Sequence, residues 1–146
     1  MISRKVYVST STFAQHNLSP LTRLEESGVE VQLNKTGKKL NVTDYLSTLL
    51  PVTGIIAGTE TYSMDELNKL PNLKVLSRLG VGMDNIDIKE AKKNGIKIYR
   101  TQTTPALAVA ELVLGLMLDL VRKISHQNNT LKSGTWKKEM GNLLHG

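Results

Sequence analysis

A chain of 146 residues is long enough for one domain with a modest core, and 40% apolar with 22% charged residues is ordinary for a globular protein. The sequence contains no cysteine, which excludes disulfides, thiolate metal sites and cysteine nucleophiles and fits a reducing cytoplasm, the expected location. The net charge of +6 comes from scattered lysines without interleaved aromatic side chains, so neither a nucleic-acid interface nor a membrane-bound form is expected.

The first hundred residues alternate short apolar runs with amphipathic segments. Strands separated by helical segments imply right-handed crossovers between parallel neighbours. The predicted fold class is therefore α/β, a doubly wound parallel five-stranded sheet with a flavodoxin-like strand order. The five strands are predicted at residues 5–9, 29–33, 54–57, 73–77 and 96–99.

Four helices are predicted between these strands, each with a capping residue at its start. Two of them end at a glycine, which favours the left-handed conformation found after a helix. The expected N-caps are Ser19, Thr43, Ser63 (in the capping box Ser63-Met-Asp-Glu66) and Asp87, and the terminating glycines are Gly28 and Gly95.

A long apolar helix is predicted at 105–123, after the last strand. Thr104 is its expected N-cap and Pro105 its first residue. Its side chains are apolar on almost every face, but Glu111 and Asp119 interrupt the run, so it is not a membrane span. Such a helix needs cover on all sides, and we expect another domain, a partner subunit, or both to supply it.

The chain is expected to comprise two parts. Residues 1–101 form the sheet domain, and residues 102–146 form a helical arm with a polar helix at 125–133 and one large anchoring side chain, Trp136. No metal site is expected. The three histidines lie in no triad-like pattern and are expected at the surface: His16, His126 and His145.

Two glycines follow the fourth strand in the segment Gly80-Val-Gly-Met-Asp-Asn85. The dinucleotide fingerprint G-x-G-x-x-G is not met, because Asn85 stands at the third glycine position and no long helix follows directly. Two glycines can instead turn successive backbone N–H groups toward one point, forming a nest for a carboxylate. A tight turn that binds nothing explains the spacing equally well.

The hydroxyl-rich segment Ser9-Thr-Ser-Thr12 follows the first strand and resembles a flavin phosphate loop. It lacks the glycine that such loops carry, so flavin binding is not expected.

Several motifs together resemble the D-isomer-specific 2-hydroxyacid dehydrogenases, and within that family the phosphoglycerate dehydrogenase-like members. The resemblance covers residues 54–146, whereas the first fifty residues match only in pattern. It rests on Ser-Arg-Leu-Gly-Val-Gly-Met-Asp-Asn-Ile-Asp at 77–87, Gly95-Ile96, Thr104-Pro105 and Val109-Ala-Glu111, in this order.

The resemblance implies an NAD-dependent oxidoreductase that oxidises or reduces a small 2-hydroxy or 2-keto acid. It implies that the peptide groups of Val81 and Gly82, next to Gly80, bind the substrate carboxylate. It also implies coenzyme contacts at Val81 and Thr104, and a homodimer formed through the helix at 105–123.

One segment departs from the phosphoglycerate-specific pattern, which places an Arg-Ser pair after the third strand. Here the residues are Ala57-Gly-Thr-Glu60. Gly58 and Thr59 could offer backbone donors to a substrate, whereas Glu60 would repel a phosphate if it faced the ligand. This leaves a generic 2-hydroxy or 2-keto acid. Arg78 could compensate, although a surface arginine or one paired with a nearby aspartate explains it equally well.

The glycine fingerprint of the family and its catalytic Arg, acidic residue and His have no counterpart in this sequence. We therefore expect the N-terminal part of such an enzyme, inactive by itself and without useful affinity for NAD. The alternative is a non-catalytic α/β module that binds a ligand or dimerises through the helix at 105–123. A glycine-rich fingerprint encoded downstream would favour the enzyme, and a stop codon would favour the module.

Overall fold

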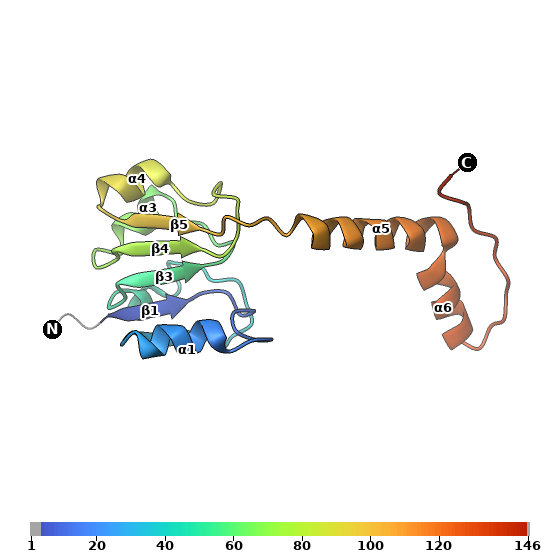
Figure 1. The fold of residues 1–146 in the computed structure, drawn as a ribbon, viewed down its shortest axis with the longest axis horizontal. Helices are drawn as coiled ribbons and strands as arrows, with labels where there is room; N and C mark the ends of the chain where they lie inside the picture. The colour runs from blue at the N-terminus through green and yellow to red at the C-terminus, as the bar shows by residue number, and fades with distance from the viewer. Residues whose placement is uncertain (1–3, 146) are drawn as a thin grey trace. The chain divides into compact units, whose positions relative to one another are not determined.

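The strands form one parallel sheet in the computed structural model, which describes residues 4–145 (Figure 1). Their order in the sheet is β2-β1-β3-β4-β5. This confirms the predicted α/β fold class and its flavodoxin-like order. The strands are β1 (Lys5–Val8), β2 (Glu30–Leu33), β3 (Gly54–Ala57), β4 (Val75–Arg78) and β5 (Lys97–Arg100).

The hydrophobic core lies against one face of this sheet. Tyr7, Ile55, Leu76 and Ile98 are neighbours in register, so their side chains share that face. The first three are buried, and Ile98 packs against them at the edge. Three short helices contribute the facing residues: Leu49 of α2 (Leu46–Leu49), Leu67 of α3 (Met64–Asn68) and Ala91 of α4 (Ile88–Lys93). Helix α1 (Ser19–Glu26) packs beside β2.

Two of the four predicted N-caps are confirmed. The Ser63 N–H donates to Glu66 Oε2 at 3.0 Å in the expected capping box. Asp87 Oδ1 accepts from the Glu90 N–H at 3.0 Å. Two positive φ angles also match the predicted terminating glycines, +74° at Gly28 and +70° at Gly95.

The other two N-cap predictions are wrong. Leu18 is the N-cap of α1, and Tyr45 is the N-cap of α2. In both places, an asparagine lies two residues before the predicted N-cap, and its side chain accepts a hydrogen bond from the backbone N–H of the predicted N-cap residue. Asn17 Oδ1 accepts from Ser19 N–H at 2.9 Å, and Asn41 Oδ1 accepts from Thr43 N–H at 3.0 Å. These asparagine turns displace the helix starts.

The chain divides into two compact units between Thr104 and Pro105. The second unit contains α5 (Ala106–Arg122) and α6 (Ile124–Lys132). Pro105, not Thr104, is the N-cap of α5, one residue later than predicted. Lys123 turns the chain between the two helices with a φ of +54°.

The segment after α6 returns to the end of α5. The Asn142 N–H donates to the Val121 carbonyl at 2.7 Å. Glu139 meets Lys123 Nζ and His126 Nε2, both at 3.2 Å, and these hydrogen bonds hold the pKa of the Glu139 carboxyl below its ordinary value. Trp136 is 84% exposed, so it does not anchor this segment to its own unit, and its role as an anchor stays a prediction.

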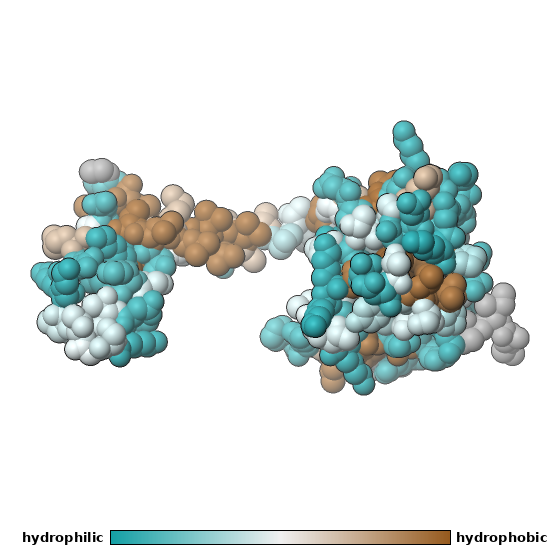
Figure 2. Space-filling model, turned by 180° about the vertical axis from the view of Figure 1, so that it is seen from behind, coloured by the Kyte–Doolittle hydropathy of each residue, from teal (hydrophilic) through white to brown (hydrophobic). Residues whose placement is uncertain are grey.

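Apolar side chains cover α5, and none of its residues is buried (Figure 2). Leu107 is 82% exposed and Leu120 is 77% exposed. Its unit offers only α6 and the returning segment as cover. Over residues 4–145, none of the helices combines the length and the apolar character needed to cross a bilayer.

Replacing Leu76 by alanine tests the assignment of the hydrophobic core to one face of the sheet. Leu76 is fully buried on β4, between β3 and β5, so Leu76→Ala should lower the free energy of unfolding by about 2–5 kcal/mol. Urea unfolding followed by far-UV circular dichroism measures this loss. Leu79→Ala is the matched control, because Leu79 is 45% exposed and its loss should cost less than about 1 kcal/mol. Equal losses for the two variants would contradict the core assignment.

Candidate functional site

A cavity of about 320 Å³ lies where the carboxyl ends of the strands meet. The strand order changes direction between β1 and β3, and open α/β sheets bind ligands at such a point, beyond the carboxyl ends of the strands. The walls come from the segments that follow β1, β2, β3 and β4. The lining residues are Ser9, Thr10, Ser11, Thr12, Gly37, Lys38, Lys39, Gly58, Thr59, Glu60, Arg78 and Leu79.

The segment after β4 carries the two glycines of the predicted nest. The Gly80 N–H is used within the protein, because it donates to the Arg78 carbonyl at 3.0 Å and to Thr101 Oγ1 at 3.1 Å. The φ of Gly80 is +150°, a backbone conformation that side-chain-bearing residues rarely adopt, so this turn favours glycine. The N–H groups of Val81 and Gly82 donate to no acceptor within residues 4–145. Two adjacent backbone donors therefore remain free in the segment that directly follows Leu79, a residue of the cavity lining.

The Val81 carbonyl is held from the neighbouring strand. Arg100, the last residue of β5, donates from Nη1 to this oxygen at 3.1 Å. The guanidinium of Arg100 therefore lies next to the segment that carries the free N–H groups of Val81 and Gly82.

Glu60 is the buried carboxylate of the site, with only 3% of its surface exposed. Its Oε1 accepts from the Gly58 N–H at 2.9 Å, from the Tyr62 hydroxyl at 2.9 Å and from the Ser9 hydroxyl. A buried carboxylate is tolerated when donors of this kind surround it. The Glu60 carboxylate is therefore hydrogen-bonded inside the protein. The expected repulsion of a ligand phosphate applies only to a carboxylate that faces the ligand.

Burial and the Glu60 carboxylate both act on Tyr62. Burial of the ring, first, and the charge of Glu60, second, raise the pKa of the Tyr62 phenol well above its ordinary value. The phenol is therefore a permanent hydrogen-bond donor to Glu60 at neutral pH.

The segments after β3 and β4 are joined by hydrogen bonds. Asn85 Nδ2 donates to the Glu60 carbonyl at 2.6 Å, and the Tyr62 N–H donates to the Asn85 carbonyl at 2.8 Å. The Asp87 N–H returns to the Tyr62 carbonyl at 2.8 Å. These bonds fix the free N–H groups relative to the cavity wall.

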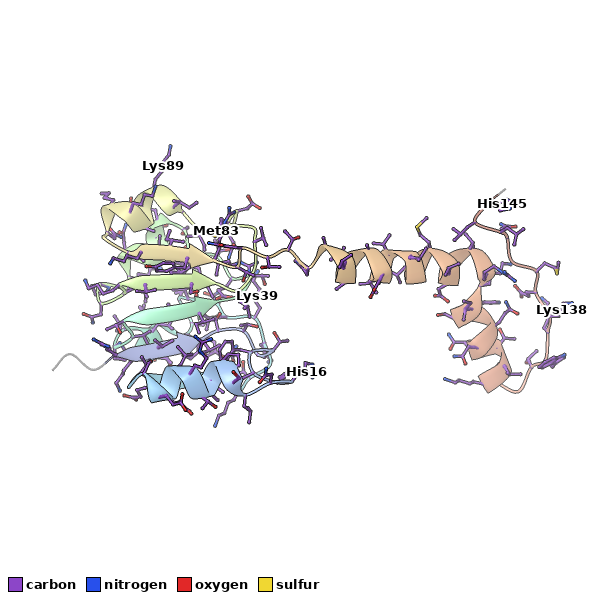
Figure 3. All side chains as sticks on the ribbon, viewed as in Figure 1. His16, Lys39, Met83, Lys89, Lys138 and His145 are labelled. Atoms are coloured by element: carbon purple, nitrogen blue, oxygen red, sulfur yellow. The ribbon has the colours of Figure 1, made fainter. Side chains whose placement is uncertain are left out.

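Positive charge dominates the rim of the cavity. Lys38, Lys39 and Arg78 line it, against the single carboxylate of Glu60. The buried side chain of Asn34 organises the lysine segment, because its Nδ2 donates to the Ser9 carbonyl at 2.8 Å and to the Lys38 carbonyl at 2.9 Å. Lys39 is seen at the carboxyl ends of the strands in Figure 3. The site therefore favours an anion.

The predicted site residues divide into two groups. Gly58, Thr59 and Arg78 line the cavity, while Gly80, Val81 and Gly82 lie on the adjoining turn. Thr104 ends the first unit. All three histidines are exposed, as expected, and within residues 4–145 no three acidic or histidine side chains gather as metal ligands.

Sequence reasoning missed several residues of this cavity. The sequence pattern assigns Ser9–Thr12 only to a loop of the flavin type, and it gives Lys38 and Lys39 no role beyond that of scattered surface lysines. Each of these residues follows the carboxyl end of a strand, which was the available signal.

Comparison with known proteins gives one consistent family. The family model for the catalytic domain of D-isomer specific 2-hydroxyacid dehydrogenases matches residues 8–138. A hydroxypyruvate reductase from Thermotoga maritima is 34% identical over 124 residues, which are 80% of this chain and 40% of that protein. The D-3-phosphoglycerate dehydrogenase of Homo sapiens is 32% identical over 148 residues, 98% of this chain and 26% of that protein.

Solved structures also match almost the whole of this chain. The TT0316 protein from Thermus thermophilus matches with a TM-score of 0.80 and 26% identity over 97% of this chain and 44% of its own. The NAD+-bound 3-phosphoglycerate dehydrogenase of Entamoeba histolytica matches with a TM-score of 0.72 and 26% identity over 97% and 43%. This chain therefore spans between a quarter and less than half of the relatives it matches.

Alkaline unfolding tests the Tyr62–Glu60 contact. Above pH 10 the unfolded tyrosine ionises while the folded Tyr62 keeps its proton, so the folded state loses stability as the pH rises. The contribution is about 1.4 kcal/mol per pH unit at most. Urea unfolding at pH 9 to 11 should show a shallower alkaline loss for Tyr62→Phe than for the unchanged chain. Tyr99→Phe, at a 56% exposed position, controls for loss of a phenol. Parallel curves for Tyr62→Phe and the unchanged chain would contradict the assignment.

Proposed function

Because the chain belongs to the D-isomer specific 2-hydroxyacid dehydrogenase family, we propose that it is the N-terminal part of an oxidoreductase that interconverts a small 2-hydroxy acid and its 2-keto acid. Residues 1–101 are the substrate-binding domain in this proposal, and residues 102–146 begin the NAD-binding domain. The observation that carries the proposal is the pair of free N–H groups at Val81 and Gly82 beside a basic cavity at the strand ends.

The substrate carboxylate binds to these two N–H groups. Backbone donors that are fixed before the ligand arrives lose little freedom on binding, and they hold a carboxylate without a charged side chain. Arg78 adds positive charge from the cavity wall, and Gly80 shapes the turn. From the segment after β3, Thr59 supplies the further donor, because the Gly58 N–H already serves Ser9 and Glu60.

The described residues, 4–145, offer no cradle for the coenzyme phosphates after β4. The glycines after β4 lead into α4, which begins only at Ile88 and has six residues, so they do not form the loop and helix N-terminus that hold a pyrophosphate. NAD supplies hydride transfer in the complete enzyme. We propose that Val81 and Thr104 contact that coenzyme.

The base that removes the hydroxyl proton is not among the histidines of this chain. His16, His126 and His145 are exposed, and none of them lines the cavity. General-base catalysis needs a group within hydrogen-bond reach of the hydroxyl. We therefore propose that this base belongs to polypeptide that the chain does not include, and that the chain alone is inactive.

Titrating the isotope-labelled chain with D-glycerate tests the carboxylate site. The amide signals of Val81 and Gly82 should shift on addition of the acid. Arg78→Gln should raise the dissociation constant about threefold to tenfold, since it removes one partly exposed positive charge. Arg23→Gln, on the exposed surface of α1, is the matched control.

Two results would refute this proposal. Glycerate shifts confined to amides outside the cavity and its adjoining turn would exclude the carboxylate site. Micromolar binding of NAD to the chain in a calorimeter would exclude the assignment of the coenzyme site to other polypeptide.

We also propose that α5 pairs with a second copy of the chain. Its large apolar side chains are exposed along its whole length, and burying one leucine contributes about 1.5–3 kcal/mol. A second copy brings the same apolar surface, which suits a symmetric helix pair.

Sedimentation velocity over a concentration series tests the pairing of α5. The unchanged chain should sediment as a dimer at micromolar concentration. Leu112→Lys combined with Leu116→Lys should shift it to monomer, because two charges would enter the helix pair. Asn128→Lys, at an exposed position of α6, should leave the dimer intact. Monomeric behaviour of the unchanged chain at all concentrations would refute the pairing.

A further inference from the structure

Glu60 contributes more than a tolerated charge. We propose that Glu60 is a positioning residue, which turns the Gly58 N–H into the protein and thereby leaves Thr59 as the donor that this segment presents to a ligand. The inference rests on the proposed function for the identity of the ligand, but its effect on Gly58 can be measured without one.

The hydrogen bonds of Glu60 reach two of the segments that build the cavity. Its Oε1 accepts from Ser9, which directly follows β1, and from Gly58 and Tyr62, which follow β3. The Ile56 carbonyl in β3, 3.0 Å from Ser9 Oγ, is the alternative acceptor for the single proton of this hydroxyl. One carboxylate oxygen thus fixes the spacing of the two strand ends between which the sheet order reverses.

The Gly58 N–H is doubly occupied. It donates to Glu60 Oε1 and to Ser9 Oγ, both at 2.9 Å, and both acceptors are buried. A ligand that used this donor would have to break both bonds. The next residue differs, because Thr59 is exposed, lines the cavity and has an N–H that donates to nothing in the described part of the chain.

The Glu60 carboxylate lies close over the backbone of Gly58. A Cβ on Gly58 would lie 2.9 Å from Glu60 Oε2, 3.5 Å from Thr10 Cβ and 3.7 Å from Ser9 Oγ. The carboxylate therefore folds back over the Gly58 backbone, and a side chain at this position would require the carboxylate to shift.

A carboxylate suits this place better than an amide. Three donors converge on one oxygen, and an ionised oxygen accepts them more strongly than the oxygen of a neutral amide. Glutamine would also present an NH₂ group to the same donors in one of its two orientations. The outer end of the segment is held independently, because Asn85 Nδ2 donates to the Glu60 carbonyl.

Glu60→Gln in the full 146-residue chain tests the proposal, with Glu66→Gln as the matched control. Both changes remove one carboxylate that accepts a backbone N–H, but Glu66 serves the capping box of α3 and does not line the cavity. Hydrogen exchange of the Gly58 amide should become about tenfold faster in Glu60→Gln and stay unchanged in Glu66→Gln.

Titration with D-glycerate supplies a readout that loss of stability alone would not move. In Glu60→Gln the glycerate shift of the Thr59 amide should shrink and the dissociation constant should rise about tenfold, whereas Glu66→Gln should bind as the unchanged chain does. If Glu60→Gln does not fold, Ser9→Ala replaces it, since it removes one donor to Glu60 and one acceptor of Gly58.

The outcomes separate the inference from the proposed function. Unchanged Gly58 exchange in a folded Glu60→Gln chain overturns the inference, whatever the ligand does. Faster Gly58 exchange together with glycerate affinity equal to that of the unchanged chain also overturns it, because the donor would then not depend on Glu60. A chain that shows faster Gly58 exchange but never binds glycerate refutes the proposed function and leaves the positioning of Gly58 established.

Discussion

Parallel pairing of the five strands is the constraint on which the site depends. Parallel strands send all their following segments out at one edge, and the chain leaves β1 and β3 toward opposite sides of the strand order, so the cavity opens at this edge. Short strands of four residues would not hold these segments in place by themselves. The hydrogen bonds of Asn34, Glu60 and Asn85 supply that fixation, each joining the end of one strand to the segment after another.

Two kinds of donor meet at this edge, and they differ in what they can recognise. The backbone N–H groups of Val81 and Gly82 have fixed directions, because Gly80 adopts a φ that other residues rarely take. Lys38, Lys39 and Arg78 act at longer range and without fixed direction. In the proposed function, the backbone donors select the geometry of a carboxylate, whereas the cations only favour negative charge. This division fits a small organic acid better than a ligand recognised by charge alone.

The sequence predicted the elements better than it predicted the site. Apolar residues located the strands to within two residues, as a continuous run at the buried strand β3 and in alternation with polar residues at the edge strand β2. Caps were predicted correctly where one side chain decides them, as at Asp87, and wrongly where a preceding asparagine competes, as at Thr43. The contacts of Glu60 were not predictable from local spacing, since its partner Ser9 is 51 residues away and meets it only through the sheet order. The same holds for Lys38 and Lys39, which reach the cavity through Asn34.

The second unit shows the opposite relation between sequence and structure. Helix α5 is predicted strongly by its residues, yet an isolated helix of 17 residues is only marginally stable in water. Its own unit supports mainly the C-terminal end, where Gly141 lies so close to Arg122 that a Cβ would meet its Cα at 2.7 Å. The first turns, including Leu107, receive no such support and expose their apolar surface. Solvent-exposed leucine adds nothing to the stability of a helix that charged residues would not add equally well. A covering surface would explain the composition of α5, and in the proposed pairing a second α5 supplies that surface.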